Sequence, residues 1–364
     1  MSRVTQLTAA DADAMLLGAE FFGASIAGHH LEHFRSWLRE VLLRRGPVPV
    51  VPPAELPAET QCAAIGVAGS MIAVVELPPS GDEPQGVAAA LENQLDRKLG
   101  AVMAMNAATI NALLPVIAAA ELDLPIVDCD GMGRILPLIS QTSYTVAGLP
   151  LTPMTATSAV RDQMSVVAEA QRAELLVRAM LNTAGGWLLC GLYPTTARQL
   201  VTGAIEGSIS RVVRVGRVLA AARDRDHILR GLGSEVGATW LGGGQVVEVG
   251  PSGKRGAEPN QPANPTTVVV RERGSSGRVI RIEAQNELLL AVVDGVLVTA
   301  VPDLICLLDR NGLRIQGLER TNVGDEVDVL MVPAAPVWHT PAGLALAGPQ
   351  AFGLPVRHPK EPVE

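Results

Sequence analysis

The sequence predicts an α/β fold in two domains, followed by a C-terminal tail. At 364 residues the chain is longer than a typical single domain. Up to residue 225, short apolar segments alternate with helix-like segments, which predicts a three-layer α/β/α domain with a largely parallel sheet. From 226 to 340, β-branched runs alternate with glycine-rich turns, which predicts a β-barrel-like domain. We expect residues 341–364 to form a tail that packs back on the domains.

The spacing of apolar residues places the elements of the first domain. The pattern predicts a helix over residues 8–22 with Thr8 as its N-cap, and an amphipathic helix over residues 29–45 that ends at Gly46. The segments that follow are predicted strands at 62–69, 101–105 and 124–128, and predicted helices at 87–100, 108–122, 170–186 and 208–223. In the second domain, residues 268–284 predict a hairpin that turns at GSSG.

Composition excludes several classes of function. Hydrophobic residues make up 48% and charged residues 18% of the chain, which favours a folded globular protein. Aromatic residues make up only 3%, the net charge is −8 and basic residues are scattered, so we expect no nucleic-acid partner. The low charge also favours a homo-oligomer.

The N-terminus and the cysteines favour a cytoplasmic protein. The first residues are polar and acidic, unlike a signal peptide, and four cysteines lie far apart in the sequence. Residues 99–120 carry no charge over a length that could span a membrane. Asn106, Thr109, Asn111 and Pro115 interrupt this stretch, so a strand, a polar turn and a buried helix explain it better. We therefore expect no membrane partner.

A polar motif, DCDGMGR, follows the predicted strand 124–128. Ligands of open α/β sheets bind at the carboxyl ends of strands, where Asp128 and Asp130 lie. The two carboxylates could orient water, hold a divalent metal or bind ring N–H groups, and their proximity would separate their pKa values. Alternatively, both aspartates cap the next segment and accept bonds from turn amides.

The other residues of this motif have similar pairs of interpretations. Arg134 could clamp a substrate carboxylate or only pair with an aspartate and lock the loop. Gly131, Met132 and Gly133 are placed with the substrate-binding residues of this loop. The alternative is that the two glycines only supply turn geometry and that Met132 fills a gap rather than contacting ligand. Cys129 is expected to be a buried thiol rather than a nucleophile, because the flanking aspartates would raise its pKa.

Two further groups are candidates outside the motif. His29 and His33, in the HHxxH segment with His30, have a spacing that can bind zinc, although no third, acidic ligand adjoins them. Asn286, between two strands of the second domain, could contact a substrate or simply belong to a polar turn.

Residues 128–137, DCDGMGRILP, resemble the D-x-D-G-M-G-R-x-x-P signature of the S-methyl-thiohydantoin desulfurase-like family. This family was long known as a domain of unknown function and is often encoded beside hydantoin-utilisation genes. Similar stretches cover much of the chain, at 206–217, 285–295, 300–309, 323–344 and 348–353. The resemblance implies an α/β domain with a β-barrel-like domain, and hydrolytic chemistry on a thiohydantoin-like or hydantoin-like ring.

The chain departs from the family pattern at two places. The family carries a G-T-G-G-G-G loop where this chain has GASIAG, residues 23–28. It also tends to have E-I-G-G-x-N where this chain reads NAATIN, residues 106–111, so Asn111 is retained and an acid becomes Asn106. An amide cannot take over acid–base work from a carboxyl group.

Two hypotheses follow. In the first, the protein is a hydrolase-like enzyme for a small cyclic amide in an interdomain cleft: Asp128 and Asp130 are catalytic, Asn106 and Asn111 bind substrate, and Arg134 binds an anionic group. In the second, it is a catalytically degenerate homologue that binds a small molecule or a partner subunit. Neither the substrate nor a cofactor follows from the sequence, and a divalent metal stays an open option.

Overall fold

The computed structural model describes residues 3–24, 31–251, 266–274 and 277–361. These residues form two compact units, each described here by itself. The first unit holds the described residues of 1–19 and 29–216, and the second holds those of 20–28 and 217–364.

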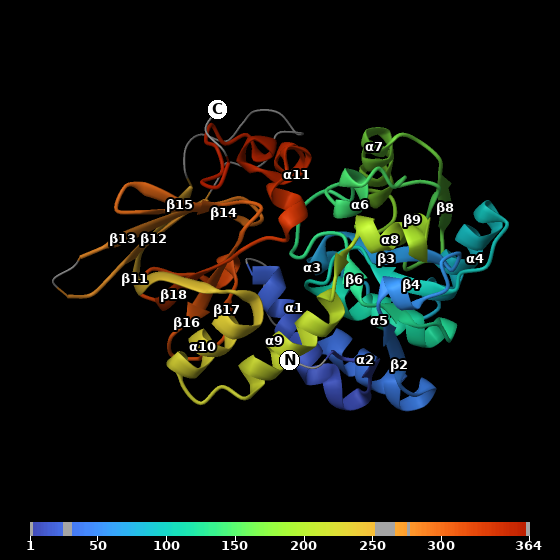
Figure 1. Cartoon of the computed structure of the whole chain (residues 1–364), viewed down its shortest axis with the longest axis horizontal. Helices are drawn as coiled ribbons and strands as arrows, with labels where there is room; N and C mark the ends of the chain where they lie inside the picture. Colours follow the sequence, from blue (N-terminus) through green and yellow to red (C-terminus); the bar gives the residue numbers. More distant parts are fainter. Residues whose placement is uncertain (1–2, 25–30, 252–265, 275–276, 362–364) are drawn as a thin grey trace. The chain divides into compact units, whose positions relative to one another are not determined.

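The first unit contains an eight-stranded mixed sheet (Figure 1). Its strand order is β1-β2-β5-β4-β3-β9-β7-β8. The bounds are β1 Gln6–Leu7, β2 Val48–Val51, β3 Gln61–Gly69, β4 Ala101–Ala104, β5 Ile126–Val127, β7 Met154–Thr157, β8 Gln163–Val166 and β9 Trp187–Thr196. A separate pair is made by β6 (Cys129–Asp130) and β10 (Ile205–Glu206), which run antiparallel.

The expected parallel arrangement is present in four neighbouring strands, β2, β5, β4 and β3, and the rest of the sheet is antiparallel. The pairs β2–β5, β5–β4 and β4–β3 are parallel, whereas β1–β2, β3–β9, β9–β7 and β7–β8 are antiparallel. The connection between β7 and β8 is too short for a crossover, so these two strands must pair as a hairpin.

The helices of the first unit include the predicted ones. Their bounds are α1 Ala12–Gly23, α2 Glu32–Arg45, α3 Met71–Glu76, α4 Glu83–Leu95, α5 Ile110–Leu122, α6 Ser143–Val146, α7 Ala170–Leu181, α8 Ala197–Gly203 and α9 Ser208–Ala220; the last residues of α1 and of α9 belong to the second unit. Helix α5 contacts β3, β4 and α2, and residues 110–120 are all buried. This burial explains why residues 99–120 lack charge. Within the described ranges, no helix is long and apolar enough to cross a membrane.

The second unit is built on an antiparallel sheet of eight strands, in the order β15-β14-β13-β12-β11-β18-β16-β17. The bounds are β11 Thr239–Pro251, β12 Thr266–Arg271, β13 Val279–Ala284, β14 Leu288–Val293, β15 Val296–Ala300, β16 Leu304–Asp309, β17 Ile315–Gln316 and β18 Glu326–Val332. Strands β12 and β13 pair antiparallel, which confirms the strand pairing of the predicted hairpin. Ser275 and Ser276 of its predicted turn lie outside the described residues. Among the described residues no pairing joins β15 to β17, so the sheet is open and is not a closed barrel.

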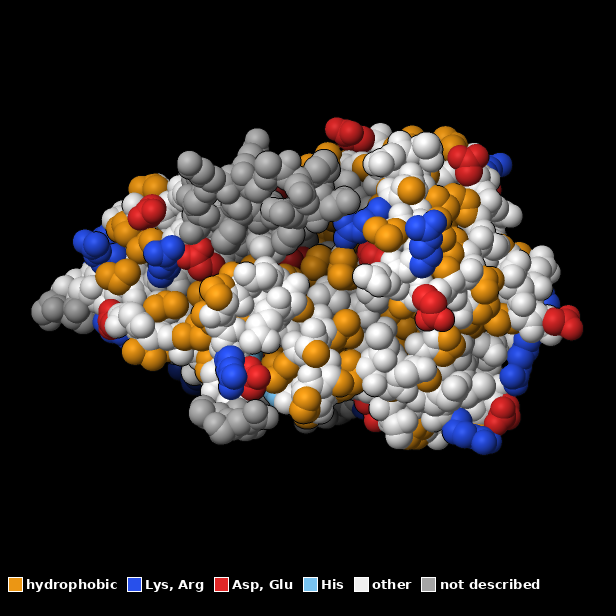
Figure 2. Space-filling model, turned by 90° about the horizontal axis from the view of Figure 1, so that it is seen from above, with side chains coloured by type: hydrophobic (Ala, Val, Ile, Leu, Met, Phe, Trp, Pro, Cys, Tyr) orange, Lys and Arg blue, Asp and Glu red, His pale blue; other side chains and the backbone are white. Residues whose placement is uncertain are grey.

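The core of the second unit lies on this sheet. Its buried members are aliphatic residues from six strands: Val246, Val268, Val270, Ile280, Ile282, Ala284, Leu288, Ala291, Val293, Ile305, Leu307, Val327 and Val329. Helices α10 (Arg225–Val236) and α11 (Pro341–Ala347) and the 3-10 turns η6 (Pro336–His339) and η7 (Pro349–Phe352) complete the unit. On the face drawn in Figure 2, charged side chains are scattered among apolar and uncharged groups, as the composition leads one to expect.

Candidate functional site

The DCDGMGR motif begins directly after β5 and contains β6, which places it at the carboxyl end of the parallel strands. Asp128 lies here against the start of α9. Its Oδ1 accepts the Ser210 N–H at 2.9 Å, and its Oδ2 accepts the Ser210 hydroxyl at 2.6 Å. A carboxylate at a helix N-terminus satisfies a free N–H and interacts favourably with the helix dipole. Asp128 therefore fixes α9 to the motif.

Asp130 joins three segments of the chain. Its Oδ2 accepts N–H groups from Ala107 and Gly133, both at 2.8 Å, and its Oδ1 accepts the Ser208 hydroxyl at 2.7 Å. The side chain is fully buried. Burial raises the pKa of Asp130, and the hydrogen bonds from Ser208, Ala107 and Gly133 oppose that rise only in part.

These hydrogen bonds support the structural interpretation of the two aspartates, with one difference from what was predicted. Asp130 does accept a bond from the Gly133 amide in its own turn. The helix that the pair holds, however, is α9, which begins about eighty residues later in the chain. The catalytic roles of Asp128 and Asp130 stay predictions.

The glycine and methionine positions shape the loop as expected. A Cβ on Gly131 would lie 2.7 Å from the ring of Tyr144, so only glycine fits there. Gly133 has φ +71°, a conformation that favours glycine. Met132 is buried. Arg134 is also buried, and its Nε donates to the carbonyl of Ile135 at 3.1 Å; its predicted roles stay predictions.

The turn between β4 and α5 faces this loop. The Gly131 N–H donates to the Met105 carbonyl, and the Ala107 N–H donates to Asp130. Within the turn, Oδ1 of Asn106 accepts the Ala108 N–H at 3.3 Å. The structure thus brings together the Asn106 turn, Asp130 and the two glycines; the substrate-binding role of Asn106 stays a prediction.

Asn111 has a structural use. Its Oδ1 accepts the Val67 N–H at 2.6 Å, and its Nδ2 donates to the Val67 carbonyl at 3.2 Å, so the side chain ties α5 to β3. A second proton on Nδ2 leaves room for one more acceptor. Its substrate-binding role stays a prediction.

Thr109 has a strained backbone, which no sequence pattern had indicated. It precedes α5 with φ +50° and ψ −143°, outside the regions that β-branched residues ordinarily adopt. It is buried, and its N–H donates to the Ala19 carbonyl at 2.9 Å. Strain of this kind persists only where surrounding contacts enforce it, and it is concentrated at ligand sites.

Cys129 is a buried thiol, which confirms the prediction. Its Sγ lies 3.9 Å from the Tyr144 hydroxyl. Burial, followed by the nearby charge of Asp130, raises its pKa well above the ordinary value of a thiol. A thiol held in its neutral form is a poor nucleophile. All four cysteines are buried and free.

Two candidates lie apart from this loop. Asn286 is exposed in the turn between β13 and β14 of the second unit, so the predicted polar turn is present and its substrate contact stays a prediction. His29 and His30 lie outside the described residues, and His33 is exposed on α2.

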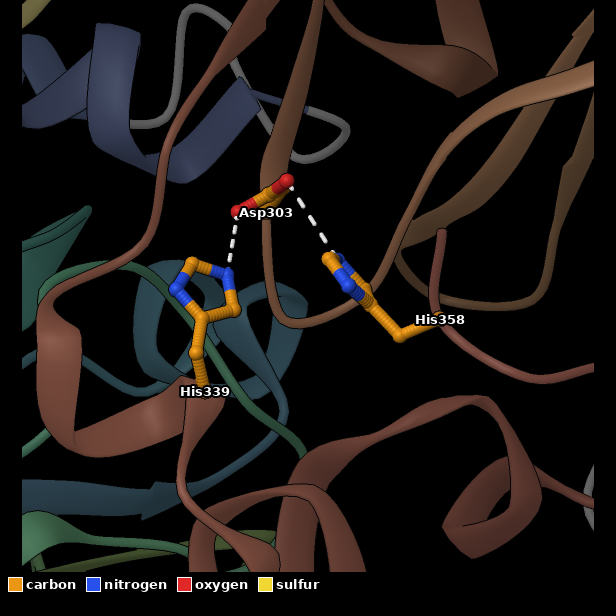
Figure 3. A group of neighbouring side chains, drawn as sticks. All are labelled: Asp303, His339 and His358. Atoms are coloured by element: carbon orange, nitrogen blue, oxygen red, sulfur yellow. Dashed lines mark hydrogen bonds and ion pairs between the residues drawn. The ribbon is translucent and has the colours of Figure 1, made fainter. Parts of the chain in front are cut away.

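A group able to hold a metal ion occurs elsewhere. Across the described ranges, the cluster of three such side chains is Asp303, His339 and His358, in the second unit (Figure 3). Sequence reasoning missed it, because each residue stands alone in its own segment and no short motif links the three.

Comparison with known proteins identifies the family. The model of the S-Me-THD-like N-terminal domain matches residues 10–168, and that of the S-Me-THD-like C-terminal domain matches residues 168–362. The chain belongs to the S-Me-THD-like family. This confirms the resemblance that the DCDGMGR motif carried.

A solved structure resembles this S-Me-THD-like chain along its full length. The X-ray crystal structure of a protein from Chromobacterium violaceum has a TM-score of 0.79 and 21% sequence identity, and the match covers 99% of this chain and 100% of that one. At this identity the likeness establishes the fold alone. No curated protein matches the chain.

Proposed function

We propose that this protein binds a small cyclic amide of the hydantoin or thiohydantoin type at the carboxyl end of β4. Membership of the S-Me-THD-like family suggests a hydantoin-related role. The observation that carries the proposal is the strained turn 106–109, which Asp130 holds through the Ala107 N–H. The conformation of Thr109 costs about 1–3 kcal/mol, which a ligand-positioning turn would explain.

The groups at this turn suit the chemistry of such a ring. A hydantoin ring presents N–H donors and carbonyl acceptors in one plane. The amide of Asn106 offers an acceptor and two donors in one plane. At the start of α5 the Ala112 N–H donates to the Thr109 carbonyl at 3.1 Å, and the N–H groups before it have no acceptor within the helix. These N–H groups could bind a ring oxygen or sulfur. In this proposal Asp128 and Asp130 hold the turn and α9 in place.

A thermal-shift screen with hydantoin, thiohydantoin and S-methyl-thiohydantoin tests this function. A ligand at one hundred times its Kd should stabilise the protein by about 2.7 kcal/mol, which is visible as a rise in Tm. We expect Asn106→Ala to remove the rise, and Asn93→Ala, which removes an exposed amide on α4, to keep it. An equal rise in both variants would place the ligand elsewhere, and no rise with any ring would reject the proposal.

Hydrolysis of the same ring is the second candidate. The observation that favours it is the raised pKa of Asp130, which follows from burial. A carboxyl group with a raised pKa can exchange protons at a higher pH than an exposed aspartate can. Asp130 would exchange the proton of the attacking water, Asp128 would support the loop beside it, and Arg134 would bind an anionic group of the substrate. Ring hydrolysis would be slow because Asn106 carries an amide where the family usually has an acid.

The variant Asp130→Asn separates the two candidates. Its amide oxygen can accept both N–H groups that now bind Oδ2, and its NH2 can donate to Ser208, whose hydroxyl can turn to the Ile205 carbonyl at 2.8 Å. We therefore expect the fold and ring binding to be kept. If the wild type opens the ring, the rate should fall at least about 100-fold in this variant. An unchanged rate would rule out Asp130 as the base, and an inactive wild type that binds the ring would reject hydrolysis.

The family pattern E-I-G-G-x-N, which places an acid at this position, suggests a complementary variant, Asn106→Glu. It places a carboxyl group where the family usually carries one. Ring-opening activity that appears in this variant would support a degenerate enzyme, and continued inactivity with retained binding would count against that origin.

A further inference from the structure

Three side chains that can bind metal converge in the second unit (Figure 3). Asp303 directly precedes β16, His339 ends η6, and His358 lies in the C-terminal segment after η7. The two rings approach opposite oxygens of one carboxylate: His339 Nε2 lies 2.9 Å from Oδ1, and His358 Nε2 lies 3.3 Å from Oδ2.

The surroundings hold the carboxylate in a fixed orientation. Asp303 and His358 are buried, and the His339 side chain is 22% exposed. Oδ1 of Asp303 also accepts the Ala334 N–H at 2.8 Å, and Lys360 Nζ lies 3.6 Å from Oδ2. Backbone N–H groups that orient a carboxylate in this way are a common support of metal ligands.

His358 shows that the cluster is incompletely satisfied. Its Nε2 is buried and points at the carboxylate, but no hydrogen bond of acceptable geometry reaches it within the described residues. A buried imidazole nitrogen without a hydrogen bond lowers stability unless another partner binds it.

We propose that Asp303, His339 and His358 bind one divalent transition-metal ion of the zinc class. Two imidazoles and one carboxylate are donors that favour zinc and similar ions, whereas calcium and magnesium favour oxygen donors throughout. Three protein ligands leave a further position open for water or a small anion, and the His339 side chain, which is 22% exposed, is the most accessible of the three. This site is independent of the ring-binding function proposed above.

The donor atoms are close enough for a single ion. All three lie within 4.8 Å of one another. Donors around a tetrahedral zinc ion, at bonds of about 2.0–2.1 Å, lie roughly 3.4 Å apart. Small movements of the two rings therefore suffice, with Asp303 kept in place by the Ala334 N–H.

Binding would change the C-terminal segment. The Lys360 N–H donates to Nδ1 of His358 at 3.1 Å, so the ring carries its proton on Nε2 without metal. An ion on Nε2 displaces that proton, and Nδ1 must then hold one, so the Lys360 amide has to release the ring. The Lys360 side chain is 49% exposed and can turn away from the ion.

Metal titration of the chelator-treated full chain tests the site. With Zn²⁺ alone we expect one ion per chain, and with Co²⁺ the visible bands of a four-coordinate ion. His339→Gln removes the more accessible imidazole, and His358→Asn keeps an acceptor for the Lys360 N–H while it removes Nε2. Each should weaken zinc binding at least about tenfold. The matched control is His33→Gln, which removes an exposed histidine of the first unit.

The outcomes are distinct. Weakened binding in both cluster variants with normal binding in His33→Gln supports the site, provided that circular dichroism shows each variant folded. A change in the Lys360 amide resonance on adding zinc gives a readout that needs no substitution. The proposal is overturned if the wild type binds no zinc, if both cluster variants bind it normally, or if only His33→Gln loses it, which would place the ion at the histidines of residues 29–33.

Discussion

At the level of single residues, the candidate site depends on two aspartates that accept hydrogen bonds from residues far away in the sequence. Asp128 and Asp130 accept bonds from Ser210 and Ser208, which follow them by 82 and 78 residues. Because the carboxylates are buried, these bonds replace the water that each would otherwise bind. The observed role of the motif is therefore structural: it joins the turn after β4, strand β6 and helix α9.

Gly131→Ala tests the close packing of this junction. The added methyl group would lie 2.7 Å from the Tyr144 ring and 3.0 Å from the Thr142 side chain. We expect the free energy of unfolding to fall by about 1–3 kcal/mol, as in other overpacked sites. Chemical denaturation measures this loss.

The control for that substitution is Gly250→Ala. An added Cβ there meets no atom within 4 Å. It should change the free energy of unfolding by no more than about 0.5 kcal/mol. Equal stability of Gly131→Ala and the wild type would show that the ring of Tyr144 can move aside.

The sequence predicted the location of these residues but not their partners. A buried strand followed by DCDGMGR has a local pattern, so Asp128 and Asp130 could be placed at the end of a strand. Ser208 and Ser210 lie on another element, and nothing local links them to the motif. The strain at Thr109 was also invisible, because threonine is not a residue type that signals positive φ.

At the scale of elements, a buried carboxylate joins α10, β11 and β18 in the second unit. Asp328 of β18 binds Arg225 Nε at 2.5 Å, Arg310 at 2.8 Å and the Trp240 indole N–H at 2.8 Å. Burial alone would raise the pKa of Asp328, but the hydrogen bonds from Arg225, Arg310 and Trp240 outweigh it and lower the pKa.

Asp328→Asn should therefore destabilise the protein in a way that depends on pH. We expect a loss of about 3 kcal/mol at pH 7, at the lower end for a broken buried ion pair, because the two arginine side chains are 32% and 29% exposed. Because the pKa of Asp328 is lower in the folded state, its carboxylate stabilises the fold fully at pH values above its ordinary pKa of about 4. This stability is lost as the pH falls through the folded-state pKa.

Denaturation at pH 7 and near pH 3 measures this dependence. The difference in free energy of unfolding between the wild type and Asp328→Asn should be smaller at the lower pH. Asp226→Asn is the matched control, since Asp226 pairs with the same Arg225 but its side chain is 69% exposed; it should have little effect. A difference that stays constant with pH would contradict the assigned pKa direction.

Elements with a strong local pattern were predicted well. The spacing of apolar residues in 29–45 and 208–223 predicted the helices that are α2, which begins at Glu32, and α9. The uncharged stretch 99–120 predicted β4 and α5. The antiparallel strands β7, β8 and β9 were missed, because β9 is buried almost throughout and shows no alternation. Closure of the second sheet was expected and is absent from the described pairings, since local strand patterns do not determine whether the edges of a sheet meet.

At the scale of the whole molecule, two family models cover residues 10–362 and one full-length fold relative supports the same architecture. Large apolar side chains such as Leu43, Val160 and Val167 are exposed at separate points in the sequence. The homo-oligomer and the cytoplasmic location stay predictions, as does the placing of a ligand between the domains. The central claim is that the strained turn before α5 positions a ring ligand.

Calorimetric titration with S-methyl-thiohydantoin, comparing wild type, Asn106→Ala and Asn93→Ala, would test this proposal. We expect one saturable site in the wild type and in Asn93→Ala, and at least about tenfold weaker binding in Asn106→Ala, equivalent to about 1.4 kcal/mol. Equal affinity in all three proteins, or no binding heat in the wild type at any of several temperatures, would contradict it.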